Sequence, residues 1–67
     1  MGISADKLKA LRKQKGFSQE ELSKVSGIPV MTIRSWEQGS RTPRDIYVIE
    51  RFCNALEISI DDLLHDE

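Results

Sequence analysis

The chain has 67 residues, of which 39% are hydrophobic and 31% are charged, and its formal net charge is −1. This composition fits one small soluble domain, and the sequence contains neither an apolar run long enough to cross a membrane nor a signal peptide. A single cysteine, Cys53, excludes an internal disulfide, and no Cys or His cluster has zinc spacing, so we expect a cytoplasmic protein without a metal or another cofactor.

The small net charge hides an uneven distribution along the chain. Residues 1–44 contain nine Lys or Arg and four Asp or Glu, a net charge of +5, whereas residues 45–67 contain one Arg and seven acids, a net charge of −6. A basic half beside an acidic half can present a positive face to nucleic acid. Ordinary solvated surface charge explains the same numbers, so the asymmetry alone does not decide the function.

A first helix is predicted from about Ser4 to Lys15. Ile3 and Leu8 have the spacing of a hydrophobic staple around its start. Gly16 follows a basic last turn and is expected to end the helix. Its apolar positions are expected to face the core: Leu8, Ala10 and Leu11.

Two short helices with a glycine turn between them are predicted next. Ser18 and Glu21 form a capping box at the start of the second helix, which ends before Gly27. The third helix is predicted from about Pro29 to Gln38, because a proline is tolerated in the first turn, where its missing N–H would be unpaired. Four apolar residues are expected to pack between these helices: Val25, Ile28, Ile33 and Trp36.

Two further helices are predicted in the last third of the chain. Thr42-Pro43-Arg44-Asp45 has the order of a cap, a first-turn proline and an acid, so a fourth helix is expected to begin here. Ser59 and Asp62 form another capping box, which opens a short fifth helix. No segment alternates in polarity as a strand does, so the expected fold class is all-α. The fourth helix has an apolar stripe that should enter the core: Ile46, Ile49, Phe52, Cys53 and Leu56.

Two helices joined by a tight glycine turn are typical of the helix-turn-helix motif, which would span residues 18–38. In this motif the second helix lies in the major groove and reads base edges, while the first crosses the phosphate backbone. Ser23 is small, as the close contact between the two helices requires. If Ile33 faces inward, four side chains of the third helix remain outside: Val30, Met31, Arg34 and Ser35.

Several short motifs follow one another in order along nearly the whole chain. They are Leu8-x-x-Leu11-Arg12, Gly16-Phe17-Ser18-Gln19-Glu20-Glu21-Leu22, Ser26-Gly27-Ile28, Thr32-Ile33, Trp36-Glu37-x-Gly39, Arg41-Thr42-Pro43 and Ile58-Ser59-Ile60-Asp61-Asp62-Leu63-Leu64. In this order and spacing they resemble the Cro/C1 phage-repressor type (XRE-type) helix-turn-helix domain. The resemblance covers about residues 5–65 of a single domain, residues 1–67, and implies a five-helix bundle like that of lambda repressor.

The resemblance implies several contacts outside the base edges. An arginine at the position of Arg44 would lie against a narrowed minor groove. Arg12 and Glu37 would form a semi-buried ion pair between the first and third helices, with a structural role, since loss of one partner would strand a charge. Phosphate contacts are expected from four residues: Ser18, Gln19, Gln38 and Arg41.

The chain departs from the family pattern where bases should be read. Members often have Ser or Thr at the position of Pro29, and Gln, Arg or Ser at those of Val30 and Met31. Two-point amide or guanidinium reading of a base is therefore not possible from these three residues. Val30 and Met31 would instead pack on thymine methyl groups, with Arg34 as the candidate for a guanine contact and Ser35 beside it. Alternatively, Val30 and Met31 form an apolar patch that meets a protein.

The sequence therefore predicts a sequence-specific DNA-binding transcriptional regulator of the repressor type. An enzyme is not expected, because no nucleophile–base pair, paired-carboxylate pocket or phosphate-binding glycine loop is present, and a domain this small has little room for a small-molecule ligand. The expected partners are double-stranded DNA and a second copy of the chain. The two copies are expected to contact each other through Ile58, Ile60 and Leu64. The alternative is a protein-interaction adaptor or antitoxin-like partner on the same fold, whose third helix contacts protein.

Overall fold

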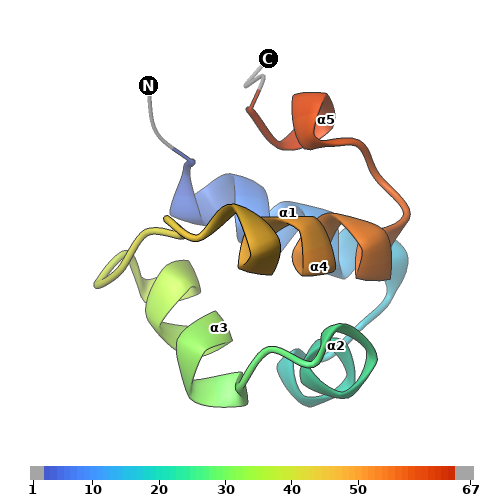
Figure 1. Ribbon diagram of the computed structural model, residues 1–67. Coiled ribbons are helices and arrows are strands. Elements are labelled where there is room, and N and C mark those ends of the chain that lie inside the picture. The colour runs from blue at the N-terminus through green and yellow to red at the C-terminus, as the bar shows by residue number, and fades with distance from the viewer. Residues whose placement is uncertain (1–2, 65–67) are drawn as a thin grey trace.

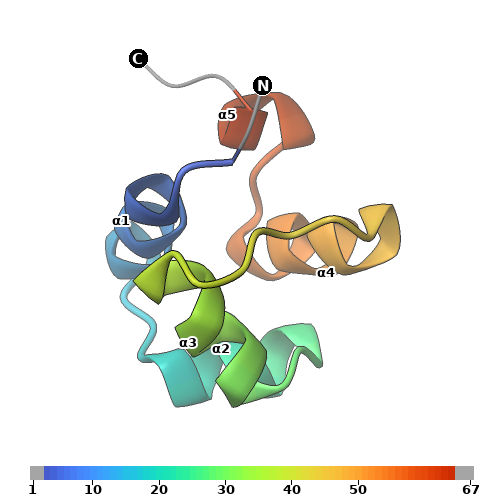
Figure 2. The ribbon, with the colours of Figure 1, turned by 90° about the vertical axis from the view of Figure 1, so that its left-hand side faces the viewer.

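The computed structural model describes residues 3–64, which form five α-helices: α1 (Ala5–Lys15), α2 (Gln19–Ser26), α3 (Val30–Gln38), α4 (Ile46–Leu56) and α5 (Ile60–Leu64). No strand forms within these residues, and the predicted all-α fold class is confirmed. α1 and α4 lie in the middle of the molecule, α2 and α3 lie at one end, and α5 lies at the other (Figure 1 and Figure 2). None of the helices in residues 3–64 is long and apolar enough to cross a membrane.

Local capping bonds determine where α2 and α5 begin. The Glu21 N–H donates to Ser18 Oγ at 3.1 Å, and the Ser18 N–H donates to the Glu21 carboxylate at 2.8 Å. The same reciprocal pair joins Ser59 and Asp62 before α5, at 3.1 and 3.2 Å. Both capping boxes predicted from the sequence are therefore confirmed. Each satisfies backbone donors that a helix start would otherwise leave unpaired.

The turn between α2 and α3 is built from Gly27 to Pro29. Gly27 has a φ of 76°, in the left-handed region that glycine adopts without a steric penalty. Pro29 is the N-cap of α3 and not, as predicted, part of its first turn, because its ψ of 139° is extended. Its carbonyl oxygen accepts the N–H groups of Thr32 and Ile33, so α3 begins directly after the proline.

The predicted start of the fourth helix is also wrong. α4 begins at Ile46, because the Asp45 carboxylate caps it by accepting the Tyr47 N–H at 2.9 Å. The Thr42-Pro43 pair, expected to be the cap and first turn, lies before the helix in the connection from α3. Residues 41–45 are non-helical and join α3 to α4 across the surface (Figure 2).

The core lies where the five helices meet. The ring of Trp36 on α3 meets that of Phe52 on α4 edge to face, with centroids 6.0 Å apart, an arrangement that aromatic pairs favour. Cys53 is buried beside Phe52, and burial raises the pKa of its thiol. The buried apolar side chains come from all five helices and the α2–α3 turn: Leu8, Leu22, Ile28, Ile33, Trp36, Ile49, Phe52, Cys53, Leu56 and Leu63.

Three apolar residues expected in the core are instead exposed: Ala10, Val25 and Ile46. Ala10 lies one residue off the stripe that Leu8 and Leu11 define, and one helical step turns it away from the core. Val25 precedes the buried Ser26 at the end of α2, and one helical step likewise turns it outward. Ile46 is the first residue of α4 and lies before the part of that helix that neighbours cover. The apolar pattern identifies the buried face of a helix but not how far along the helix burial extends.

Candidate nucleic-acid interface

α3 has one buried face and one open face. Ile33 and Trp36 pack into the core, at 1% and 5% exposure. Met31, Arg34 and Gln38 are exposed and follow each other at helical spacings of three and four residues. These three side chains form the open row of α3. Met31 is 64% exposed, so an apolar side chain contributes much of the surface of the open row.

The other predicted base-reading residues border the open row. Pro29 is exposed just before α3, while Val30 and Ser35 are half-buried. The Ser35 carbonyl oxygen accepts the N–H groups of Ser40 and Arg41 at 3.0 and 3.3 Å, where the chain leaves the helix. Val30 and Ser35 therefore offer less surface than the open row to a partner.

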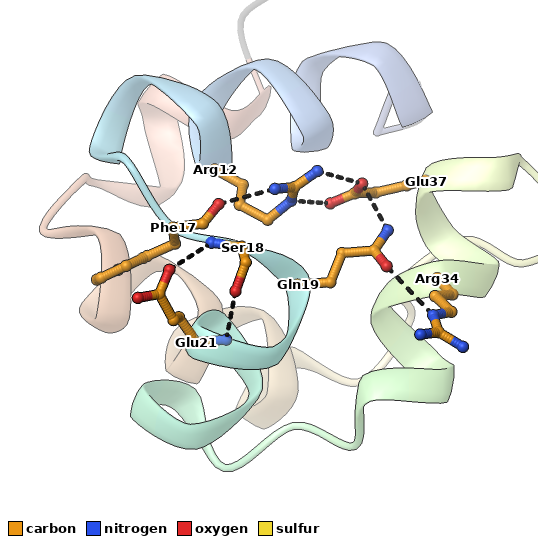
Figure 3. A network of polar contacts seen from close by, with 7 residues as sticks. All are labelled: Arg12, Phe17, Ser18, Gln19, Glu21, Arg34 and Glu37. Carbon is orange, nitrogen blue, oxygen red and sulfur yellow. Dashed lines mark hydrogen bonds and ion pairs between the residues drawn. The ribbon is translucent and has the colours of Figure 1, made fainter.

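Arg12 and Glu37 join α1 to α3 (Figure 3). Arg12 Nε donates to Glu37 Oε2 at 2.7 Å and Nη2 donates to Oε1 at 2.9 Å, while Nη1 donates to the Phe17 carbonyl oxygen at 2.7 Å. The two side chains are only 9% and 4% exposed. The structure thus brings together the two residues that the resemblance paired, with every guanidinium nitrogen bonded.

The ion pair shifts the pKa values of both its members. Hydrogen bonding to Glu37 raises the pKa of Arg12 above its ordinary value, against the effect of burial. Burial alone would raise the pKa of Glu37, but hydrogen bonds from Arg12 and Gln19 outweigh it and hold that pKa below its usual range. Both groups are therefore charged at neutral pH, and the pair acts as a fixed electrostatic link.

Gln19 extends this network to the open row of α3. Its Nε2 donates to Glu37 Oε1 at 3.1 Å, and its Oε1 accepts from Arg34 Nε at 3.2 Å (Figure 3). Arg34 Nη2 also lies 3.4 Å from Glu20 Oε2. The expected phosphate ligand Gln19 and the expected base reader Arg34 are thus bonded to each other. Sequence reasoning missed this contact, because its partners are 15 residues apart on different helices.

The connection between α3 and α4 surrounds a hollow of about 410 Å³, lined by Ser40, Arg41, Thr42 and Arg44. Two guanidinium groups and two hydroxyl groups supply hydrogen-bond donors of the kind that bind phosphate oxygens. The sequence predicted a phosphate contact for Arg41 and a minor-groove contact for Arg44. No contact was predicted for Ser40, and Thr42 was expected to cap a helix. Thr42 lies between the two arginines in the sequence and Ser40 directly precedes the first of them, which was the signal that could have identified both.

The residues predicted at a dimer interface lie on or next to α5, at the end of the molecule opposite α2 and α3 (Figure 1). Ile58, Ile60 and Leu64 are all half-buried, and the first two pack against the core. α5 also contains Asp61 and Asp62, which places these acids far from the open row of α3. In the part of the chain that the structure describes, no group of three His, Cys, Asp or Glu side chains is placed to hold a metal ion.

Comparison with known protein families identifies the fold family. The profile of a family described as "Helix-turn-helix" matches residues 8–63, from α1 into α5. The chain belongs to this helix-turn-helix family. The match includes the α2–α3 motif together with the helices that pack on it, and the predicted family resemblance is confirmed.

Two helix-turn-helix relatives match over most of the chain. It is 36% identical over 61 residues to the uncharacterized HTH-type transcriptional regulator YazB of Bacillus subtilis (strain 168), an overlap of 91% of this chain and 87% of YazB. It is 30% identical over 61 residues to the HTH-type transcriptional regulator SinR of Bacillus licheniformis, an overlap of 91% of this chain and 55% of SinR. The chain therefore matches most of the length of YazB and about half of SinR.

Proposed function

We propose that this chain is a DNA-binding transcriptional regulator of the repressor type, which binds a two-fold operator as a homodimer and places α3 in the major groove. The main supporting observation is the open row of α3. The N-terminus of α2 lies beside this row, because Arg34 is bonded to Gln19. This is the arrangement in which a helix-turn-helix reads bases with one helix and crosses phosphates with the other. The family membership and the names of both relatives agree with it.

Each residue predicted at the interface has a role in this proposal. Arg34 donates to O6 and N7 of a guanine, while Val30 and Met31 contact thymine methyl groups, with Pro29 and Ser35 at the edges of the contact. Phosphate contacts come from Ser18, Gln19, Gln38 and Arg41, and Arg44 lies against the minor groove.

A second copy of the chain would double the small number of base contacts that one domain offers. Two-fold symmetry would place the half-sites about one helical turn, roughly 34 Å, apart. Ile58, Ile60 and Leu64 are the proposed dimer contacts, since each keeps part of its apolar surface exposed. The acids of α5 lie at the end away from α2 and α3, where they would not repel phosphate. The protein would meet its DNA in the cytoplasm.

Binding to duplex DNA tests this proposal. A probe of about 24 base pairs, long enough for two half-sites, is selected from a random duplex pool with the wild-type chain. We expect specific binding that weakens between about 50 and 200 mM salt and is lost when Arg34→Ala and Arg44→Ala are combined. Failure to bind any duplex at low salt would contradict the proposal.

A second candidate is a protein adaptor or antitoxin-like partner whose α3 meets another protein. The exposed apolar side chains of Val25 and Met31, at 57% and 64% exposure, favour it. This candidate predicts no salt-dependent binding to any duplex and no role for Arg44, so the same assay separates the two.

A further inference from the structure

We propose that Glu20 lowers the DNA affinity of this chain by holding Arg34 against α2 when no DNA is bound. The inference rests on the proposed function, in which Arg34 reads a guanine. In the free chain Arg34 Nε donates to Gln19 Oε1 at 3.2 Å, Nη2 lies 3.4 Å from Glu20 Oε2, and Nη1 lies 4.0 Å from the sulfur of Met31. Every guanidinium nitrogen therefore has a partner within the protein.

The geometry of guanidinium makes the Glu20 contact compete with two-point reading of a base through the Nε/Nη2 edge. A guanidinium can present two parallel N–H groups only along its Nε/Nη2 edge or its Nη1/Nη2 edge. Arg12 uses the first of these edges on Glu37. Nη2 carries one N–H on each edge, and Arg34 directs Nε at Gln19 and Nη2 at Glu20, so its Nε/Nη2 edge faces α2. A bidentate contact from this Nε/Nη2 edge to guanine must therefore displace Glu20.

The exposure of this pair indicates that DNA can displace Glu20. The side chains of Arg34 and Glu20 are 45% and 63% exposed, whereas those of Arg12 and Glu37 are almost fully covered. Exposed ion pairs of this kind correspond to changes of at most about fivefold in an equilibrium constant. Glu20 is thus a weak competitor for Arg34, and its effect is measurable as a moderate change in DNA affinity.

A different effect of Glu20 must be separated from this one. Glu20 lies in the first turn of α2, the part of the motif that would approach a phosphate, so its charge could repel DNA directly. Direct repulsion does not involve Arg34 and would persist without it. Competition for Arg34 disappears when the guanidinium is removed. A double-mutant cycle distinguishes the two.

The cycle compares the wild-type chain with Glu20→Gln, Arg34→Ala and the double variant, by fluorescence anisotropy on the duplex selected by the wild-type chain. We expect Glu20→Gln to bind about two- to fivefold more tightly than wild type, and the same substitution in the Arg34→Ala background to change affinity by less than about 1.5-fold. Glu50→Gln is the matched control for net charge: Glu50 is exposed on α4 and forms no ion pair within residues 3–64. It should leave affinity unchanged.

The free protein gives an independent readout. In the NMR spectrum the Arg34 Nε–H signal should shift in Glu20→Gln but not in Glu50→Gln, because only the first removes a contact of the guanidinium. Equal tightening in both Arg34 backgrounds would assign the effect to phosphate repulsion and overturn the inference while leaving the proposed function intact. An affinity of Glu20→Gln equal to that of the wild-type chain would also overturn the inference and leave the proposed function intact. Absence of duplex binding by the wild-type chain would overturn the proposed function and the inference with it.

Discussion

Arg12 of α1 and Glu37 of α3 are joined by two charge-assisted hydrogen bonds, of 2.7 and 2.9 Å, in a pair that solvent hardly reaches. The same carboxylate accepts from Gln19 of α2, so three helices meet at one group. The position of α3 relative to α2, on which any groove contact depends, is therefore fixed by a polar link as well as by the apolar core.

Replacing only one residue of this pair should lower the free energy of unfolding by more than half of what replacing both residues costs. Arg12→Met strands the Glu37 carboxylate where water hardly reaches it, at a cost of about 3 kcal/mol. Arg12→Met combined with Glu37→Leu leaves no buried charge, so the double variant should be more stable than the sum of the single variants predicts. Urea unfolding at neutral pH, followed by circular dichroism, measures all three. Additive costs would show that the pair has no coupling energy.

The stability of the fold should decrease in acid because of Glu37. Its pKa in the folded chain lies below the ordinary value of 4.5 that applies to the unfolded chain. The contribution of Glu37 to the free energy of unfolding is therefore complete at pH values above that ordinary value. It is lost as the pH falls from that value through the pKa of Glu37 in the folded chain. Thermal unfolding between about pH 3 and pH 7 measures the loss.

The Glu37→Gln variant is the control for this pH dependence. Its melting temperature should vary less over the acid range than that of the wild-type chain. Some dependence will remain, because a hydrogen bond from Lys15 also lowers the pKa of the exposed Glu57. An acid-induced loss as large as that of the wild type would show that Glu37 is not the group responsible.

Replacement of glutamate by glycine should have opposite effects at the end and in the middle of α4. Glu57 ends the helix with a φ of 59°, in the left-handed region that glycine prefers. Glu57→Gly should raise Tm by about 3 °C, since the exposed 2.6 Å contact with Lys15 contributes little. Glu50→Gly, within the helix, should lower Tm by about 4–8 °C. Calorimetry checks both, and a fall in Tm for Glu57→Gly would contradict the argument.

Arg34 and Arg41 should differ in how their loss affects DNA binding. Arg34→Ala is expected to weaken binding to the selected duplex by about 10- to 100-fold and to affect a scrambled duplex much less. Arg41→Ala should weaken binding to both duplexes alike and reduce the slope of affinity against salt by about one. Anisotropy titrations at several salt concentrations give both quantities. A uniform loss for Arg34→Ala would assign Arg34 to phosphate.

Features that depend on neighbours in the sequence were predicted well. The capping boxes at Ser18 and Ser59 involve residues three positions apart, so their pattern determines their contacts. The start of α4 was wrong because two local signals compete: Thr42-Pro43 is a good helix start, but Asp45 captures the Tyr47 N–H instead. A sequence contains both signals and does not state which one the tertiary structure uses.

Features that depend on how helices pack could not be read from the pattern. The bond from Arg34 to Gln19 exists because α2 and α3 cross at a particular angle, and neither residue indicates it. Val25 is exposed although the next residue, Ser26, is buried, so the covered face of α2 turns away from Val25. The Arg12–Glu37 contact was anticipated only through family resemblance, since 25 residues separate its members.

The edge-to-face contact of Trp36 with Phe52 provides the chain with a built-in optical probe. Trp36 is the one tryptophan in the sequence, and it lies on the side of α3 opposite the open row. Its emission spectrum therefore reports whether α3 is seated on α4, and it should shift to longer wavelength on unfolding. A ligand docked on the outer side of α3 should leave the emission maximum unchanged. For every variant discussed above, one fluorescence spectrum can distinguish a damaged fold from a damaged surface.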